Sequence, residues 1–402
     1  MSRLRFLFKF AWRNLGRHPF RTLIMSLGLG FGTGYIIFAL NFSKSGSKEI
    51  IDDFLAQFTG DHQLVAPDFY PDLDKKKFDP QGVLREPQVH GIDRSRYVER
   101  ISLPVFLSGP KKTQGTILTG LDADREHKLS KVRKALAQGS FLPGGAPNEL
   151  VLGERLARRL GVGLGDDVVV MGQGLDGSSA VDLFRVVGLM NFGGGDMEDA
   201  VAFTSLGSAR SFGVLPADGF HQLIRFAGQA QAPPAPPAGV VMVPWEEILP
   251  EVNGSIKFID IFTWIVAVIL VIVISLGMGN TLMITFLERE KEFYSLNVIG
   301  VRSSWIAWAL AIEVFFLALI GIGAGVLLGN LVTAYFYHNP ISLLLFTGGK
   351  PIMMGGMAII PKVRLYAHHH YSWQAPLLVA GFLALSLVLP IYRVIQRSKR
   401  VN

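Results

Sequence analysis

Four long stretches of the chain are almost uninterrupted runs of apolar residues. They lie at residues 20–42, 256–286, 305–337 and 375–392. A helix of about 20 apolar residues, rising about 1.5 Å per residue, crosses the roughly 30 Å hydrocarbon core of a bilayer. The pattern therefore predicts four transmembrane helices, with a domain at residues 43–255 and a loop at 338–374 on one side of the membrane. The short link at residues 287–304 and the tail at 393–402 then lie on the opposite side.

The residues before the first apolar run have a different pattern. Leu4, Phe8 and Trp12 recur at helical spacing with basic residues between them. This arrangement is typical of an amphipathic helix at a membrane interface. Pro19 follows and marks the bend into the first span. We therefore predict a cytoplasmic amphipathic elbow helix over residues 1–19.

The long polar interval between the first two runs has the mixed pattern of a folded domain. Strand, helix, glycine-rich turn and strand are expected along ELVLGERLARRLGVGLGDDVVVM, residues 149–171. Two strands and a short helix are expected along residues 182–192 and 199–212. The segment QAQAPPAPPAGVV, residues 229–241, favours an extended polyproline spacer. The interval is therefore expected to be a large mixed α/β domain between helices 1 and 2.

Composition agrees with a membrane protein, and the charge pattern indicates its orientation. Half of the 402 residues are hydrophobic and 18% are charged, an apolar balance for a chain of this size. Basic residues cluster beside the apolar runs at both ends, so the net charge of +7 indicates topology and not nucleic-acid binding. The positive-inside rule places both termini in the cytoplasm, which an even number of spans requires. The absence of cysteine excludes disulfides and thiolate metal sites without deciding the compartment.

Glycines stand at every second position of LGLGFGTGYI, residues 27–36. The spacing lacks the third glycine of a G-x-G-x-x-G nucleotide loop, so a dinucleotide site is excluded. In a membrane helix, glycines four residues apart allow a neighbouring helix to approach closely. Gly28 with Gly32 form one such face, and Gly30 with Gly34 form a second. The residues that we predict to pack helices together are Gly28, Gly32, Gly321 and Gly325.

One carboxylate lies inside the third apolar run. Glu313 is about two turns into the span, where a charged side chain costs about 2.5–3.5 kcal/mol unless it faces protein or is neutralised. We expect Glu313 to face the helix bundle. A polar clamp between helices is favoured over a proton relay, because no second acidic or basic residue lies in the middle of a span.

The link between the second and third runs, FLEREKEFYSLNVIGVRSSW, carries the clearest local signal. Its mixed charges at residues 288–292 support a helical turn, Phe293 and Leu296 add an apolar face, and Gly300 ends the element. A solvated turn with supporting ion pairs and a docking surface for a cytoplasmic partner explain this pattern equally well.

Motifs for other chemistry are weak. The run AHHHYSW invites a zinc interpretation, but only His368 and His370 would share one face of a strand, and no third ligand stands nearby. The segment SGPKKT lacks the spacing of a Walker motif, and no G-x-S-x-G context is present. We therefore expect no catalytic residue, no metal site and no cofactor in this chain.

The arrangement as a whole resembles a known family. One span, a large external domain and three further spans with a charged link resemble the MacB-type ABC transporter permeases, closest to their lipoprotein-releasing LolC/LolE-type branch. The segments that carry the likeness are WRNLGRHPFRTLI (elbow), LVLGERLARRLGVGLGDDVVV and FRVVGLM (external domain), VPWEEILP (return to the membrane), LEREKEFYSLNVIGVRSSWI (coupling helix) and EVFFLALIGIGAGVLLG (third span). The opening TGDHQLVAPDFY is more similar to the lipoprotein-release branch than to the FtsX branch, whose external domain is smaller.

The resemblance implies a non-catalytic permease subunit in the bacterial inner membrane. A dimer of a separate ATP-binding subunit would bind ATP and Mg and push on the coupling helix, and the periplasmic domain would move in response. The residues expected to couple to that ATPase are Glu288, Arg289, Glu292, Phe293, Leu296 and Gly300. The other implied partners are a second permease copy or a paralogue, membrane lipids, a lipoprotein substrate and a periplasmic carrier, with no nucleic acid.

Other functions remain open beside lipoprotein release. A MacB-type exporter, working with an adaptor and an outer-membrane channel, shares these motifs. An FtsX-type signalling permease would instead control a cell-wall hydrolase through its external domain. A metal-dependent membrane enzyme built on residues 368–370 ranks last.

Overall fold

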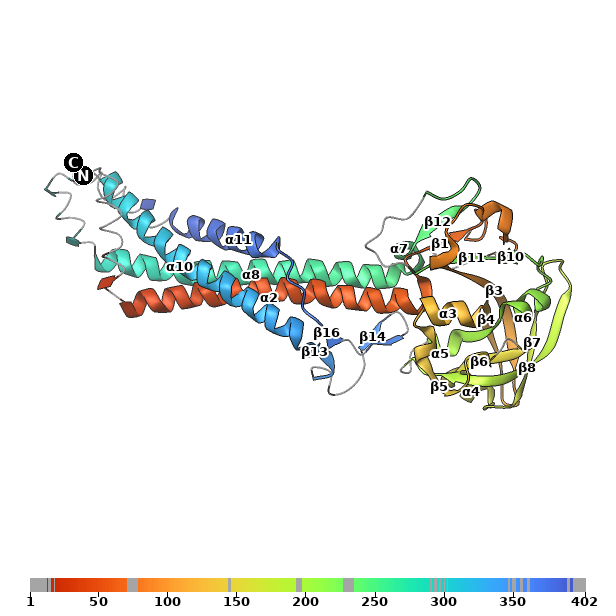
Figure 1. Cartoon of the computed structure of the whole chain (residues 1–402). Coiled ribbons are helices and arrows are strands. Elements are labelled where there is room, and N and C mark those ends of the chain that lie inside the picture. Colours follow the sequence, from red (N-terminus) through yellow and green to blue (C-terminus); the bar gives the residue numbers. More distant parts are fainter. Residues whose placement is uncertain are drawn as a thin grey trace. The chain divides into compact units, whose positions relative to one another are not determined.

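A computed structural model gives the fold of most of the chain (Figure 1). It describes residues 13, 16–17, 19–70, 79–143, 146–192, 197–226, 235–289, 291–292, 295, 298–299, 301, 303–345, 348, 352–354, 357–359, 362–388 and 391–392. The chain forms two compact units: a helical unit of residues 1–47, 257–341 and 362–402, and a sheet unit of residues 48–256 and 342–361. The predicted elbow helix lies almost wholly outside the described residues.

Four long helices among the described residues contribute to the helical unit. They are α2 (Pro19–Phe54), α8 (Pro250–Glu288), α10 (Ser303–His338) and α11 (Tyr371–Ser386). Within the described residues, three segments are long and apolar enough to cross a membrane: Pro19–Thr59, Pro250–Thr285 and Ser304–His338. Of the predicted fourth span, residues 375–388 and 391–392 are described, and they include most of the 16-residue helix α11.

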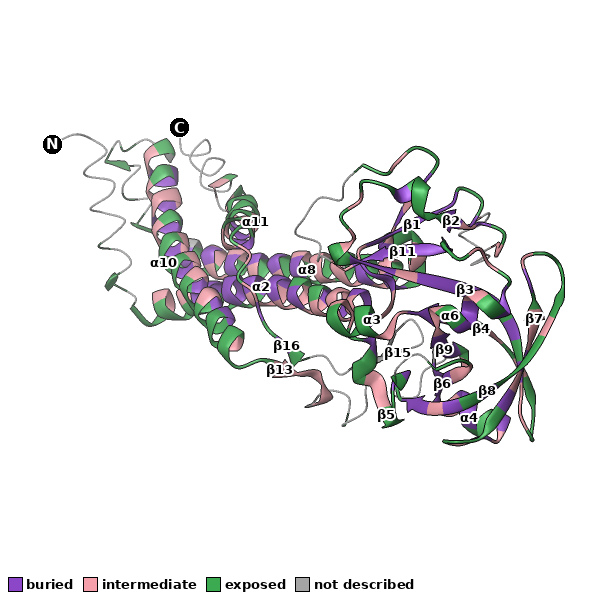
Figure 2. Ribbon diagram, turned by 45° about the vertical axis from the view of Figure 1, so that its right-hand side comes forward, coloured by how far each residue is buried: buried purple, intermediate pink, exposed green. Residues whose placement is uncertain are grey.

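These helices pack through one buried apolar cluster, and they lie side by side in both views (Figures 1 and 2). The cluster includes Leu29 and Ile36 of α2, Val271 of α8, Val314 of α10 and Val379 of α11. Large apolar side chains also cover the outside of the helices. A helix that is hydrophobic all round suits a lipid environment, where the exposed side chains meet hydrocarbon.

The sheet unit is built on a ten-stranded sheet among the described residues, in the order β12-β1-β11-β3-β4-β9-β6-β8-β5, with β7 paired to β3 and β8. Its strands are β1 (His62–Val65), β3 (Tyr97–Ser108), β4 (Thr113–Leu121), β5 (Leu136–Gly139), β6 (Glu149–Gly153), β7 (Asp167–Gln173), β8 (Ser179–Met190), β9 (Val201–Ser205), β11 (Gln222–Arg225) and β12 (Val241–Pro244). Most pairs are antiparallel, and β4·β9 and β6·β8 are parallel.

Short helices and strands complete the described elements. The helices of the sheet unit are the π-helix η1 (Leu55–Thr59), η2 (Glu86–Val89), η3 (Arg94–Arg96), α3 (Ala123–Leu129), η4 (Val132–Ala135), α4 (Glu154–Leu160), α5 (Met197–Ala200), α6 (Leu206–Phe212), α7 (Trp245–Ile248) and η6 (Leu343–Leu345). The short strands are β2 (Leu84–Arg85), β10 (Gly219–Phe220), β13 (Ile341–Ser342), β14 (Ile352–Met354), β15 (Met357–Ile359) and β16 (Lys362–Val363).

Two of the local predictions for this domain are confirmed, whereas residues 229–234 of the predicted polyproline spacer lie outside the described residues. The order β6, α4, turn, β7 occupies the segment that predicts strand, helix, glycine-rich turn and strand. Gly161 ends α4 with a φ of 80°, a left-handed conformation that costs glycine little, and its N–H bonds the Ala157 carbonyl at 2.9 Å. The order β8, β9, α6 likewise matches the two strands and short helix expected farther along.

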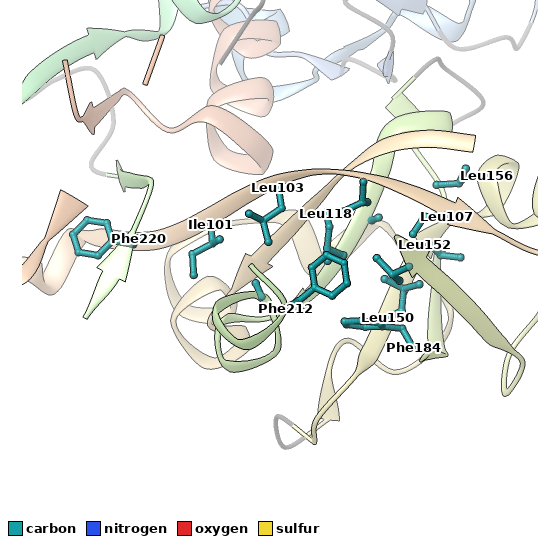
Figure 3. Packing of buried hydrophobic residues seen from close by; sticks show 14 of the residues in the cluster. Ile101, Leu103, Leu107, Leu118, Leu150, Leu152, Leu156, Phe184, Phe212 and Phe220 are labelled. Carbon is teal, nitrogen blue, oxygen red and sulfur yellow. The ribbon is translucent and has the colours of Figure 1, made fainter. Parts of the chain in front are cut away.

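The sheet has one buried and one exposed face over β3, β4, β7 and β8. Alternate residues of β3, such as Ile101 and Leu103, point into a core shared with Leu118 of β4 and Phe184 of β8 (Figure 3). Phe106 of β3 lies on the opposite face and is exposed. The alternation follows from the two-residue period of a strand.

Candidate functional site

The charged segment after α8 is the first part of the candidate site. Of the six residues predicted to contact an ATPase, the structure describes Glu288, Arg289 and Glu292; Phe293, Leu296 and Gly300 lie outside the described residues. Glu288 is the last residue of α8, and the N–H of Arg289 still bonds the Thr285 carbonyl at 3.2 Å. The start of the predicted link is therefore a direct continuation of the second span.

Neighbouring residues of this segment pair with different helices. Arg21 Nη1, on α2, donates to Glu288 Oε2 at 3.4 Å. Arg289 Nη1 donates to Glu313 Oε2 of α10 at 3.1 Å, and Arg289 Nε lies 3.5 Å from Glu292 Oε2. The side chains of Glu288 and Glu292 are 60% and 59% exposed, whereas that of Arg289 is only 11% exposed. The two carboxylates therefore face outward within this chain, and Arg289 faces the other helices.

Glu313 occupies a protein-facing position, with a side chain 11% exposed. Its charged partner, Arg289, comes from the link and not from a span, which is why a search for a second charge in the middle of a span misses it. The sequence does hold a signal for this pair. In two antiparallel helices joined by a short link, residues equally far from the middle of the link lie side by side, and 289 and 313 are equally far from Val301.

Close helix packing joins α2 to α10 through glycines. A Cβ on Gly30 would lie 3.1 Å from the carbonyl oxygen of Gly321, and a Cβ on Gly34 would lie 3.1 Å from that of Gly325. Such backbone contact requires glycine on both helices. Gly321 and Gly325 therefore face the second glycine pair of α2, Gly30 with Gly34, within this chain.

The other glycine pair of α2 has a different environment. Gly32 faces the side chain of Ile274 on α8. Gly28 is exposed and has no atom of the described residues within 4 Å of a Cβ built on it. Gly30 and Gly34 therefore make the close backbone contact with α10, and Gly32 faces α8 instead. The helical period turns Gly28 away from α10. Packing of a neighbouring helix against Gly28 remains a prediction.

A buried joint holds the end of the first helix within the sheet unit. Ile50 and Phe54 of α2 pack with Trp245 of α7 and Val252 of α8. The π-helix η1 follows, and its carbonyls are bound from outside: Lys131 N–H donates to Ala56 O at 2.6 Å, and Arg100 Nη1 donates to Phe58 O.

The arginine of this joint is itself paired. Arg100 Nε donates to Glu126 Oε1 at 2.6 Å, with side chains 6% and 0% exposed. Gly60 ends η1 at a φ of 60°, and a side chain there would collide with the Arg225 carbonyl. Sequence reasoning missed this joint, because Arg100, Glu126 and η1 are far apart in the chain.

The histidine run does not form a strand. Residues 364–368 are irregular and 369–370 form a turn before α11. His368 N–H donates to Asn41 Oδ1 at 2.9 Å, and the rings of His368 and His370 are 5.6 Å apart. Among the described residues, no group of three or more His, Cys, Asp and Glu side chains is placed to hold a metal ion.

Buried titratable side chains in the sheet unit have structural partners. His221 Nδ1 accepts from Ser102 N–H at 3.0 Å, and Nε2 lies 2.9 Å from Pro80 O, so the neutral Nε2–H form fits both contacts. Burial lowers the pKa of His221 to about 4. Burial, followed by the nearby Arg225 charge, lowers the pKa of His62 to about 4. Burial raises the pKa of Tyr70 to about 12.

The long apolar helices, with a mixed domain between the first two of them, are the arrangement of a membrane protein with one large folded domain beside its helices. Residues 22–233 match the family described as the MacB-like periplasmic core domain, and residues 264–399 match the FtsX-like permease C-terminal family. The chain belongs to the MacB/FtsX family of ABC transporter permeases.

The chain is similar to an uncharacterised ABC transporter permease protein of Mycobacterium tuberculosis, with 24% identity over 342 residues. The match covers 80% of this chain and 37% of that protein. The chain therefore spans little more than a third of the relative's length.

Two solved structures show weak likeness. One is the extracellular domain of the noncanonic ABC-type transporter YknZ from Gram-positive bacteria, with 12% identity, 42% of this chain and 84% of that chain covered, and a TM-score of 0.28. The other is a domain of a putative permease protein from Porphyromonas gingivalis, with 15% identity, 44% and 65% covered, and a TM-score of 0.22. These scores are too low for either structure to carry an argument.

Proposed function

We propose that this chain is the transmembrane subunit of a transporter that releases lipoproteins from the bacterial inner membrane toward the outer membrane. A separate ATP-binding subunit, as a dimer that holds ATP and Mg, drives the movement. The observation that carries the ATP-driven part of the proposal is the segment after α8. It presents the exposed carboxylates of Glu288 and Glu292, while Arg289 ties its start to α10.

Two long helices are suited to transmit the movement. The helices α2 and α8 run for 36 and 39 residues without a break. A stiff helix moves as a body, and packed helices exchange discrete arrangements when a ligand contacts two states differently. Glycine contacts between α2 and α10 let these helices move together. The periplasmic domain follows in this mechanism, and no substrate passes between the spans.

The lipoprotein cargo rests on the resemblance of the segment after the first span to the lipoprotein-release branch. In that arrangement both termini are cytoplasmic and the sheet unit is periplasmic. Two permeases, identical or paralogous, stand side by side, and a lipid-anchored protein enters between them from the outer leaflet before a periplasmic carrier accepts it.

Two further functions use the same ATP-driven movement with different periplasmic partners. A MacB-type exporter works with an adaptor and an outer-membrane channel. An FtsX-type permease controls a cell-wall hydrolase and moves no cargo. The three functions differ in the proteins that bind the chain on the periplasmic side.

The test is mass spectrometry of proteins that purify with the tagged full-length chain from native membranes in a mild detergent. We expect an ATP-binding subunit together with lipoproteins or a lipoprotein carrier. Recovery of an adaptor and channel would support the exporter in place of lipoprotein release. Recovery of a cell-wall hydrolase would support the FtsX-type permease. Absence of any ATP-binding subunit, where other membrane complexes survive, would overturn the whole proposal.

Matched variants test the coupling segment in the same purification. Glu292→Lys reverses an exposed charge that we place against the ATP-binding subunit, so the amount of that subunit recovered should fall several-fold. Asp124→Lys makes the same change on the exposed surface of α3 and should leave recovery unchanged. Equal recovery with both variants would contradict docking at Glu292.

A further inference from the structure

We infer that Glu313 is a positioning residue: through Arg289 it holds the segment that follows α8 in the orientation that the ATP-binding subunit recognises. The inference rests on the proposed function. It assigns Arg289 a role inside the helix bundle, in place of direct contact with the ATPase.

The geometry sets this ion pair apart from the other interhelical pairs described in the helical unit. Arg289 and Glu313 are each 11% exposed and 3.1 Å apart. The pair Arg21–Glu288 has exposures of 24% and 60%, and the pair Lys44–Asp260 has exposures of 48% and 35%. Solvent weakens exposed pairs, whereas a shielded pair keeps a stronger attraction and leaves a costly lone charge when one partner is removed.

The position of Arg289 directly after α8 allows the ion pair to orient the segment that follows. Arg289 directly follows the last residue of α8, and its guanidinium contacts Glu313 on one side and Glu292 on the other. Its side chain thus links α10 to the first turn of the coupling segment. Loss of the Glu313 charge removes the fixed end of this link, and the segment is then free to change its orientation.

A purely packing role would not require charge at position 313. An apolar side chain packs in a membrane helix at lower cost than a carboxylate. A buried ion pair instead specifies one register between two elements, because only one arrangement satisfies both charges. The pair is therefore suited to orient the segment between α8 and α10.

Electron paramagnetic resonance on the full-length chain in lipid vesicles tests the positioning directly. The chain contains no cysteine, so Ser295→Cys gives one exposed attachment point for a nitroxide label within the segment. Adding E313Q should increase the mobility of the label. E313D keeps the carboxylate and loses volume, whereas E313Q keeps the volume and loses the charge, so E313D should leave the label closer to the parent mobility than E313Q; a packing role predicts the reverse order. D260N, which removes the exposed pair with Lys44, is the matched control and should leave the spectrum unchanged.

Recovery of the ATP-binding subunit is the second readout. E313Q should lower recovery about fivefold or more, the scale of a typical coupling energy, and E313D should lower it less. An unchanged spectrum with E313Q, unchanged recovery with E313Q, or a larger effect of E313D than of E313Q overturns the inference. Absence of the ATP-binding subunit from the wild-type purification overturns the proposed function instead, so the two failures are distinguishable.

Discussion

At the scale of single residues, the Arg100–Glu126 pair decides how the first long helix ends in the sheet unit. Both side chains are almost fully buried, and Arg100 also binds the Phe58 carbonyl at the end of η1. Glu126→Gln would leave the Arg100 charge buried without its partner carboxylate. The free energy of unfolding of the sheet unit should therefore fall by about 3–5 kcal/mol.

Thermal unfolding of the full-length chain, followed by the fluorescence of its tryptophans, measures this loss, because Trp245 is buried at the same joint. Lys131→Ala is the control: it removes an exposed ion pair with Asp53 and keeps the N–H that binds Ala56. Its cost should stay within about 1 kcal/mol. Equal losses for the two variants would contradict a special role of the buried pair.

His221 gives the sheet unit a defined response to acid. Its pKa is about 4 in the folded chain, against about 6.5 when exposed. Between these values the unfolded chain binds a proton that the folded chain does not, so stability falls as the pH falls through this window, by at most about 1.4 kcal/mol per pH unit for this residue.

The unfolding midpoint at pH 7 and pH 5 measures the effect. His221→Gln should show a smaller difference between the two pH values than the wild type, even though the variant is less stable throughout. His90→Gln, which changes an exposed histidine, should keep the wild-type difference. A wild-type pH response in His221→Gln would assign the acid sensitivity to other groups, such as His62.

At the scale of elements, the contact of α2 with α10 depends on backbone approach. A Cβ on Gly325 would lie 2.6 Å from the Cβ of Thr33, too close for both helices to keep their positions. Gly325→Ala should therefore lower the melting temperature, even though alanine favours a helix by about 1 kcal/mol. Gly28→Ala, where nothing in the described chain stands within 4 Å, should be neutral or stabilising in the isolated chain.

Melting of the two variants in the same detergent checks this prediction. A stabilised Gly325→Ala would mean that the helices separate easily and that the glycine contact has little structural weight. A destabilised Gly28→Ala would point to a helix contact at Gly28 outside the described residues.

Much of the element pattern follows from the sequence, because apolar runs and strand alternation are local. The extension of α2 through residues 43–54 does not follow from the sequence, because that stretch is mostly polar and Ile50 and Phe54 are buried in a cluster that includes residues distant in the chain, such as Trp245. Strand order cannot be predicted from local patterns either, because β4 pairs with β9, which comes about 80 residues later in the chain. At the candidate site, the charges of Glu288 and Glu292 are visible in the sequence, but the direction that Arg289 takes depends on α10.

At the scale of the whole molecule, the proposed function requires that the sheet unit and the coupling segment lie on opposite sides of the membrane. The cysteine-free chain allows a direct test with single substitutions. Ser178→Cys lies in the exposed turn between β7 and β8, and Ser295→Cys lies in the segment after α8. Basic residues flanking the spans predict that the segment after α8 is cytoplasmic, so a maleimide that cannot cross membranes should label only Ser178→Cys in intact spheroplasts.

Both variants should be labelled after detergent permeabilisation, which serves as the control for reactivity. Labelling of Ser295→Cys alone in intact spheroplasts would reverse the orientation and place the candidate ATPase surface outside the cell. ATP is supplied in the cytoplasm, so that orientation would remove the energy source from the mechanism and with it the role of Glu313 in orienting the segment. The topology is therefore the condition on which the residue-level and element-level proposals at the candidate site depend.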